Sequence, residues 1–300
     1  MLEILRYLPI DNRCRVRRVC KTWNRIVSDN SLWRHVDLLE YRLDLRTMWK
    51  FVRTHFSPCL LTMKIQGYAQ AGNHKRWRAL LSDSMLKELA ACCPNLWLLH
   101  LHDCRTNNLS FESLPPSITC LKIVSTIWRP RWIKDKQKHL AKLEHLTLDK
   151  SVRVDAYDLE DIAFWKNLKR LSLMGCSRIG KTHVETFAYN FTELELLNLS
   201  GTNINHSALH DIAHYLKKLK ELYLAGIQSV NDEIVACIAE GLPVLNKLDL
   251  SYCEFVSLEG LESLCDSRLA VLIFKHFPAL SEKDVQGFRT SFPANFILII

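Results

Sequence analysis

The stretch "LKRLSLMGC", residues 168–176, carries the pattern that decides the fold of this 300-residue chain. Leu171 and Leu173 are two residues apart, so in a strand both side chains point to one face, which Leu168 joins at the strand entry. The frame L-x-x-L-x-L, or a close variant, begins at residues 60, 96, 118, 143, 168, 194, 219, 245 and 269. Six of the eight spacings are 24 to 26 residues, a period that indicates stacked structural repeats.

Amphipathic helical patterns follow several of these strands after a polar turn. One strand and one helix cannot bury both of their apolar faces alone, whereas stacked copies can. We therefore predict an α/β fold, a solenoid with a curved parallel sheet inside and helices outside. The helical patterns begin at Asp158, Thr182, Ser207, Asn231 and Ser281.

A small, weakly polar residue occupies the eighth position after the first residue of several frames. Such a side chain suits a tight exit from the strand into the loop. The register is similar to the cysteine-containing class of leucine-rich repeats, and we expect about nine repeats over residues 57–300. No histidine recurs in register with these cysteines and no Cys-x-x-Cys pair occurs, so no catalytic or metal role is expected for them. The residues at this position include Cys104, Thr126, Ser151, Cys176, Thr202 and Cys253.

The N-terminal residues and the cysteines indicate in which cellular compartment the protein is expected. Charged residues between Glu3 and Arg18 interrupt any secretory apolar region, and no uninterrupted apolar segment is long enough to span a membrane. We therefore expect the 11 cysteines to be reduced thiols in a protein of the cytoplasm, the nucleus or both, without a membrane partner.

The net charge of +8 is unevenly distributed. Residues 1–150 carry 26 basic and 13 acidic side chains, whereas residues 151–300 carry 14 basic and 19 acidic ones. The basic half favours an acidic or phosphorylated partner. The alternative is a solvated surface with no partner.

The beginning of the chain has short helical patterns in place of the repeat. After a first apolar helix, two further helices are expected over residues 11–18 and 19–27. Trp23 shares a helix face with Val19, and Trp33 is expected to fold back onto the bundle. We interpret both tryptophans as core residues, because a platform for stacking nucleic-acid bases would need them exposed.

The segment "LEILRYLPIDNRCRVRRVCKTWNRIVSDNSLWRHVDL", residues 2–38, resembles the F-box. The matching elements are the L-x-x-I/L-x-x-L-P helix end, the "RRVCKTW" core and the "SLW" closure. Ahead of leucine-rich repeats, this segment resembles the F-box/leucine-rich-repeat family. The resemblance implies an F-box over residues 1–38, a connecting helical segment over residues 39–56 and repeats over residues 57–300. Family members begin further upstream, so we expect the N-terminal part of the first F-box helix to be missing.

The resemblance also implies a non-catalytic bridge that needs no cofactor. Proteins of this family are substrate-recognition subunits of SCF-type cullin-RING E3 ubiquitin ligases. Their F-box docks on a Skp-type adaptor, which connects them to the cullin scaffold and the RING subunit. The expected adaptor-binding residues are Leu5, Leu8, Pro9 and Ile10, although Leu5 and Leu8 could equally point into the core.

Residues between the buried leucines are expected to face a protein substrate on the concave surface. They form a column of Lys64, His100, Lys122, Thr147, Ser172, Asn198, Tyr223, Asp249 and Ile273. Two irregular segments, residues 66–83 and 126–139, interrupt the period, and the second holds Trp128 and Trp132 among basic residues. The predicted substrate-binding residues are Lys64, His100, Lys122, Arg129, Arg131, Arg170 and Tyr223. Alternatively, residues 126–139 only cap a repeat edge, with the tryptophans packed beneath solvated charges.

Other function classes have weaker support. The sequence has no Walker loop, nucleophile elbow or His-Glu-x-x-His motif, and its 12 histidines show no partner pattern, so no catalytic or metal site is predicted. A leucine-rich interaction scaffold without ligase function is one alternative. A basic nucleic-acid-binding protein is another, which the charge of the first half supports.

Overall fold

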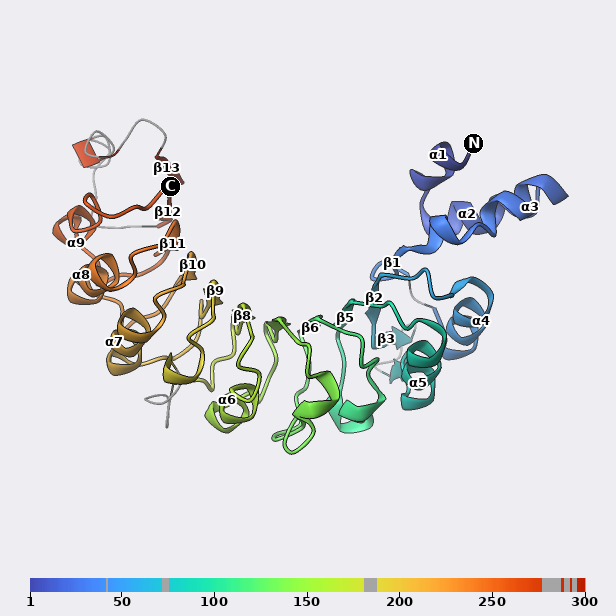
Figure 1. The fold of residues 1–300 in the computed structure, drawn as a ribbon, viewed down its shortest axis with the longest axis horizontal. Coiled ribbons are helices and arrows are strands. Elements are labelled where there is room, and N and C mark those ends of the chain that lie inside the picture. Colours follow the sequence, from blue (N-terminus) through green and yellow to red (C-terminus); the bar gives the residue numbers. More distant parts are fainter. Residues whose placement is uncertain are drawn as a thin grey trace. The chain divides into compact units, whose positions relative to one another are not determined.

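The computed structural model describes residues 1–41, 43–71, 76–180, 188–276, 287–288, 292 and 296–299. Contacts divide the chain into two compact units. The first unit comprises residues 1–124 and 138–142, and the second comprises residues 125–137 and 143–300. Each unit contains parallel strands that have helices on one side (Figure 1). Among the described residues, no helix combines the length and the apolar composition that crossing a membrane would require.

Short helices begin the first unit. They are α1 (Leu2–Arg6), α2 (Ile10–Val16), α3 (Lys21–Val27) and the 3₁₀ helix η1 (Asn30–Trp33). The Arg13 guanidinium donates to the carbonyl oxygens of Arg6 at 2.7 Å, of Leu8 at 2.9 Å and of Leu32 at 2.7 Å. Carbonyl groups at helix ends have no partner within the helix. Arg13 therefore ties the end of α1 to η1.

The two N-terminal tryptophans differ in burial. Trp33 is 1% exposed, and its indole N–H donates to the Val27 carbonyl at 2.8 Å, as expected for a core residue. Its ring lies 4.0 Å from that of His55, where burial lowers the pKa of His55 to about 4. Trp23 is only half-buried, and Val19 is 67% exposed. The predicted Trp23–Val19 face is wrong because α3 begins at Lys21, after Val19.

Four parallel strands are described in the first unit, and they neighbour one another in the order β1, β2, β5, β6. They are β1 (His35–Asp37), β2 (Thr62–Gln66), β5 (Leu98–His102) and β6 (Cys120–Val124). Their register aligns a buried row of Val36, Met63, Leu99 and Leu121. Helices α4 (Leu45–His55) and α5 (Asp83–Cys92) lie on one side of these strands (Figure 1). The remaining elements are the 3₁₀ helices η2 (Thr106–Asn108), η3 (Phe111–Ser113) and η4 (Gln137–Leu140), the last of which begins in the second unit.

The first irregular segment of the sequence forms an antiparallel hairpin. Its strands are β3 (Tyr68–Ala71) and β4 (Arg76–Ala79). The hairpin accounts for the 36-residue spacing between the first two frames, because it is inserted between β2 and α5.

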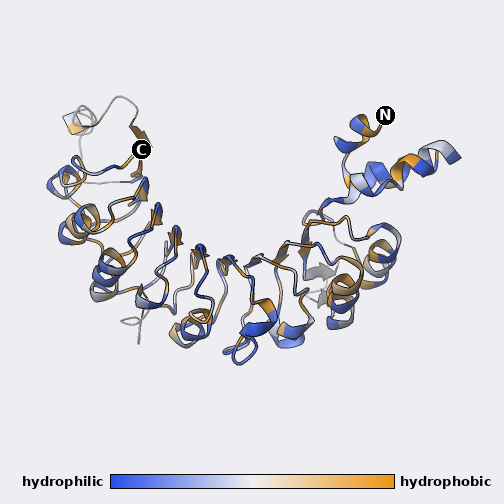
Figure 2. Ribbon diagram, viewed as in Figure 1, coloured by the Kyte–Doolittle hydropathy of each residue, from blue (hydrophilic) through white to orange (hydrophobic). Residues whose placement is uncertain are grey.

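The second unit contains seven parallel strands in sequence order, counted over its described residues. They are β7 (His145–Thr147), β8 (Arg170–Ser172), β9 (Leu196–Asn198), β10 (Glu221–Tyr223), β11 (Lys247–Asp249), β12 (Val271–Ile273) and β13 (Ile297–Ile299). Its described helices are α6 (Ala156–Ile162), η6 (Ala188–Asn190), α7 (His206–Tyr215), α8 (Asp232–Gly241) and α9 (Leu258–Glu262). These helices carry both hydrophobic and hydrophilic residues (Figure 2).

The predicted fold class is confirmed: parallel strands alternate with helices or 3₁₀ turns after an N-terminal helical segment. In the second unit the strands line the inner side of a curve and the helices its outer side (Figure 1). Much of the helix expected from Thr182 lies outside the described residues, and so does the helix expected from Ser281 except for residues 287–288. The boundaries at residues 38 and 56 remain predictions.

A left-handed turn residue follows the strands of eight of the nine frames at a fixed position, seven residues after the start of the frame. In the second unit, the backbone N–H of Gly175 donates to the Ser200 carbonyl and that of Gly201 to the Ala225 carbonyl, both at 2.8 Å. Glycine adopts positive φ at little cost, whereas other residues need surrounding contacts to hold it. The residues with positive φ at this position are Asp103, Ser125, Lys150, Gly175, Gly201, Gly226, Tyr252 and His276.

The small residue after this turn has a structural role. Cys176 and Cys253 are no more than 1% exposed, and their Sγ atoms lie 3.1 and 3.3 Å from carbonyl oxygens of the preceding repeat. Burial raises the pKa of Cys176 to about 12 and that of Cys253 to about 11. The thiols therefore stay protonated and donate to those carbonyls.

The second irregular segment packs against α6. Trp128 and Trp132 are 0% and 3% exposed, and their rings meet edge to face at 5.3 Å. The Arg131 backbone N–H donates to the buried carboxylate of Asp158 at 2.9 Å, and its Nε lies 3.1 Å from Asp161 Oδ2. These contacts favour the alternative in which the segment caps a repeat edge.

We predict that native-state alkylation separates the cysteines into two classes. Cys20 is exposed, whereas Cys104 and Cys176 are buried, and burial raises the pKa of each to about 12. Because the thiolate is the reacting species, iodoacetamide labels Cys20 in the folded chain and labels the buried pair only in urea. Mass spectrometry of tryptic peptides measures this difference, and labelling of Cys176 as fast as that of Cys20 would contradict the packing.

We also predict that Arg131→Ala lowers the free energy of unfolding by about 2 kcal/mol, because Asp161 keeps a buried carboxylate without its guanidinium partner. Arg129→Ala is the matched control, since Arg129 lies two residues away and is exposed. Its expected loss is below about 0.5 kcal/mol. Urea unfolding followed by circular dichroism compares the two, and equal losses would argue against the anchoring role of Arg131.

Candidate protein-binding surfaces

The predicted column is present in the first unit. Lys64, His100 and Lys122 occupy matching positions on β2, β5 and β6. Asp37 extends the column on β1, and its Oδ2 lies 2.8 Å from Lys64 Nζ. The sequence reasoning missed Asp37 because the segment around β1 lacks the leucine frame. Lys64 is therefore paired within the column.

His100 lies at the centre of this column. Burial lowers its pKa to about 4, and the positive charges of Lys122 and Lys64 act in the same direction. Its Nε2 atom is buried and accepts or donates no hydrogen bond among the described residues. The column thus presents a neutral imidazole between two lysines.

The second unit carries a more polar column. Thr147, Ser172, Asn198, Tyr223, Asp249 and Ile273 align on β7 to β12, as predicted. Tyr223 donates its hydroxyl hydrogen to Glu221 Oε2 at 2.7 Å, and Arg170 Nη2 lies 3.4 Å from Glu221 Oε1. Lys247 Nζ lies 5.2 Å from the centre of the Tyr223 ring. Two predicted substrate contacts, Arg170 and Tyr223, therefore converge on Glu221, which the sequence reasoning did not single out.

Arg129 and Arg131 do not join either column, because their segment packs on α6. Arg131 Nη1 lies 3.3 Å from Glu160 Oε2 and 3.1 Å from the Tyr157 carbonyl, in addition to its Asp161 pair. Arg131 thus anchors its own loop to α6, and its role as a substrate contact stays a prediction. Arg129 is exposed and remains a predicted substrate contact.

The four predicted adaptor-binding residues differ in their solvent exposure. Leu5 is 0% exposed, so it belongs to the core of the helical segment, which was the alternative for this residue. Leu8 and Ile10 are half-buried, Pro9 is exposed, and the three line a pocket of about 410 Å³. Leu5 therefore cannot contribute its side chain to an adaptor, whereas the other three remain available.

Further apolar side chains are exposed in the same helical segment. Ile4 is 67% and Tyr7 is 86% exposed, and both lie on or just after α1, three residues apart. Residues three apart share a helix face. The three-residue spacing of Ile4 and Tyr7 was the available sequence signal, but it does not distinguish an exposed apolar pair from a buried one. Ile4 and Tyr7 are thus candidate partner contacts.

Residues 1–39 of the chain match the F-box-like family. Over 253 residues the chain is 30% identical to F-box/LRR-repeat protein 12 of Homo sapiens, which covers 83% of this chain and 76% of that protein. The Bos taurus protein of the same name is 29% identical over 255 residues with the same coverage. A Caenorhabditis elegans protein described as putative RNA-binding protein EEED8.10 is 24% identical over 289 residues, but the match covers 38% of its length.

These similarities agree with the architecture in the part of the chain that the structure describes. The F-box-like match covers α1 to α3 and β1, and the relatives of 29–30% identity extend over most of the repeats. The chain belongs to the F-box/leucine-rich-repeat family.

Proposed function

We propose that this chain is the substrate-recognition subunit of an SCF-type cullin-RING E3 ubiquitin ligase. The observation that supports this most is the presence, in one chain, of an F-box-like segment and of leucine-rich strands with a solvent-facing polar column. In this role the chain is a non-catalytic bridge in the cytoplasm or nucleus, without a cofactor. The chemistry of ubiquitin transfer takes place on partner subunits, and the captured protein is marked for degradation.

We assign the Skp-type adaptor to the apolar surface of the helical segment. Leu8, Pro9 and Ile10 form its predicted centre, and the exposed Ile4 and Tyr7 extend it. Large apolar side chains that become fully buried at an interface commonly contribute about 2 kcal/mol or more each. The cullin scaffold and the RING subunit are connected through the adaptor.

We assign an acidic or phosphorylated protein segment to the column of the first unit. Burial is the main cause of the lowered pKa of His100, and the positive charges of Lys122 and Lys64 lower it further. Lys64 is already paired with Asp37, so a carboxylate or phosphate would bind beside Lys122, where its negative charge would favour an imidazolium at His100. Charged hydrogen bonds of this kind are stronger than neutral ones. In the second unit, Arg170 already shares Glu221 with Tyr223, so we expect polar contacts there and no comparable preference for anions.

The proposal has two separable binding activities, which one affinity-purification experiment tests. Tagged chain is expressed in cultured cells, and co-purified adaptor, cullin and other proteins are quantified by mass spectrometry. Tyr7→Asp is expected to reduce recovered adaptor and cullin at least about tenfold, because it places a charge in an apolar contact. Lys122→Glu is expected to retain the adaptor and to lose acidic substrates.

Lys87→Glu is the matched control for the charge reversal. Lys87 is an exposed lysine of the same unit, but it lies on α5 and not on the strand column. It should retain adaptor and substrates alike. Absence of the adaptor from the wild-type purification would reject the ligase role in favour of a plain scaffold, and recovery of RNA with a steep salt dependence would favour the nucleic-acid alternative.

A further inference from the structure

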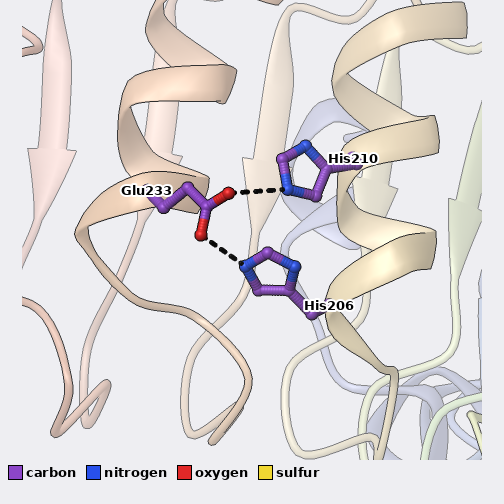
Figure 3. A group of neighbouring side chains, drawn as sticks. All are labelled: His206, His210 and Glu233. Atoms are coloured by element: carbon purple, nitrogen blue, oxygen red, sulfur yellow. Dashed lines mark ion pairs between the residues drawn. The ribbon is translucent and has the colours of Figure 1, made fainter.

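Two histidines and a glutamate from neighbouring helices converge on the outer side of the second unit (Figure 3). His206 and His210 extend from α7, and Glu233 extends from α8. His206 Nε2 lies 3.4 Å from Glu233 Oε2, and His210 Nε2 lies 3.6 Å from Glu233 Oε1. The three side chains each offer one ligand atom, and these atoms lie within 4.8 Å of one another. Both imidazoles therefore point at one carboxylate.

Helix geometry explains the convergence. His206 and His210 are four residues apart, which puts them on one face of α7. Glu233 and Cys237 have the same spacing on α8. The sequence contained the His-x-x-x-His signal, but its partner Glu233 lies one repeat further along the chain. Only the stacking of repeats brings the two helix faces together.

The distance between α7 and α8 is fixed by close backbone contacts. Gly241 lies so near the Ala213 carbonyl that a Cβ atom at that position would come within 2.4 Å of its oxygen. Lys217 Nζ donates to the carbonyl oxygens of Gly241 at 2.8 Å and of Ala213 at 3.1 Å. Ile212 and Ile238 are buried at 0% and 1% exposure. The cluster is thus held in place by packing that does not depend on its own charges.

The geometry matches the needs of a small transition-metal ion. A tetrahedral ion with bonds of about 2.0–2.1 Å separates its ligand atoms by roughly 3.4 Å. The distances from His206 Nε2 to Glu233 Oε2, 3.4 Å, and from His210 Nε2 to Glu233 Oε1, 3.6 Å, are close to that value, and the three ligand atoms lie within 4.8 Å of one another. Two histidines and one carboxylate form a ligand set that zinc uses in proteins, with the fourth position left to water or to a partner's side chain. Imidazole ligands disfavour calcium and magnesium, which prefer oxygen.

A second contact would support ligation by His210. Cys237 Sγ lies 3.3 Å from His210 Nδ1, the ring nitrogen that faces away from Glu233. Metal-binding histidines commonly donate the N–H of their other nitrogen to a neighbouring acceptor, which fixes the ring. His210 and Cys237 also line a pocket of about 330 Å³ on the protein surface, so an ion can reach them from solvent.

We propose that His206, His210 and Glu233 form a binding site for a divalent transition-metal ion, with zinc as its natural occupant. The ion connects α7 to α8 and thereby joins two consecutive repeats. Cys237 positions His210 and is not itself a ligand. The site is independent of the adaptor surface and of the strand columns, since it lies on the helical side of the second unit.

Titration of the purified full chain with zinc chloride, followed by isothermal calorimetry at pH 7.5, tests this site. The wild type should bind one zinc ion at this cluster and show a higher melting temperature with zinc than without it. His210→Ala and Glu233→Gln should each weaken this binding at least about tenfold. His214→Ala is the matched control, because His214 lies one turn further along α7 and is exposed. It should bind zinc like the wild type.

Two further measurements keep the outcome interpretable. Melting curves without zinc should agree among the wild type and all three variants, because the substituted side chains are only half-buried or exposed. Cobalt(II) in place of zinc should give tetrahedral visible absorption without the near-ultraviolet charge-transfer band of a thiolate ligand. Zinc binding that survives His210→Ala and Glu233→Gln, a thiolate band, or no saturable binding at concentrations up to about 1 mM would overturn the proposal and leave only histidine–glutamate ion pairs.

Discussion

The structure depends on the burial of one apolar residue, in most strands a leucine, against the matching residue of the neighbouring strands. Leu171, Leu197 and Leu222 are all 0% exposed and aligned by register on β8, β9 and β10. Each contributes about 2 kcal/mol of burial free energy. With only three residues per strand, this row fixes which side chains face the interior. It therefore also determines which side chains form the polar column on the strands.

The positions of the polar column follow directly from the burial of the leucine row. A shift of register by one residue would exchange the leucines with the polar column. The buried Cys or Thr after the left-handed turn supports the same register, because its side chain donates to a backbone carbonyl within the repeat or in the one before. In the first unit, Trp33 and His55 connect the F-box-like helices to α4, and Arg13 holds their ends together. Both proposed binding surfaces thus rest on packed elements.

The sequence predicted the features that recur and missed those that occur once. The leucine frame located nine of the described strands and the alignment of Lys64 with His100. It did not predict β1, because Val36 is the only buried residue of that strand and no frame surrounds it. The pairing of Arg131 with Asp161 was also hidden, because it depends on the positive φ of Arg131 and on the position of α6.

The difference between recurring features and single features also applies to the helices of the second unit. Binary patterns identified α7 and α8 as amphipathic, but no sequence period relates His206 to Glu233. Contacts between helices of successive repeats follow from the stacking distance, which single-repeat patterns do not contain. The predicted helix face of Val19 and Trp23 was wrong for a local reason. The helix begins two residues after Val19, so Val19 does not belong to it.

The most direct test of this account compares Leu171→Ala with Ser172→Ala on strand β8. Leu171 is fully buried, whereas its neighbour Ser172 faces the column and is half-buried. Measured by urea unfolding, Leu171→Ala should lower the free energy of unfolding by about 2–5 kcal/mol, and Ser172→Ala by less than about 1 kcal/mol. Similar losses at the two positions, or a larger loss at Ser172, would contradict the inward leucine row on which the proposed surfaces depend.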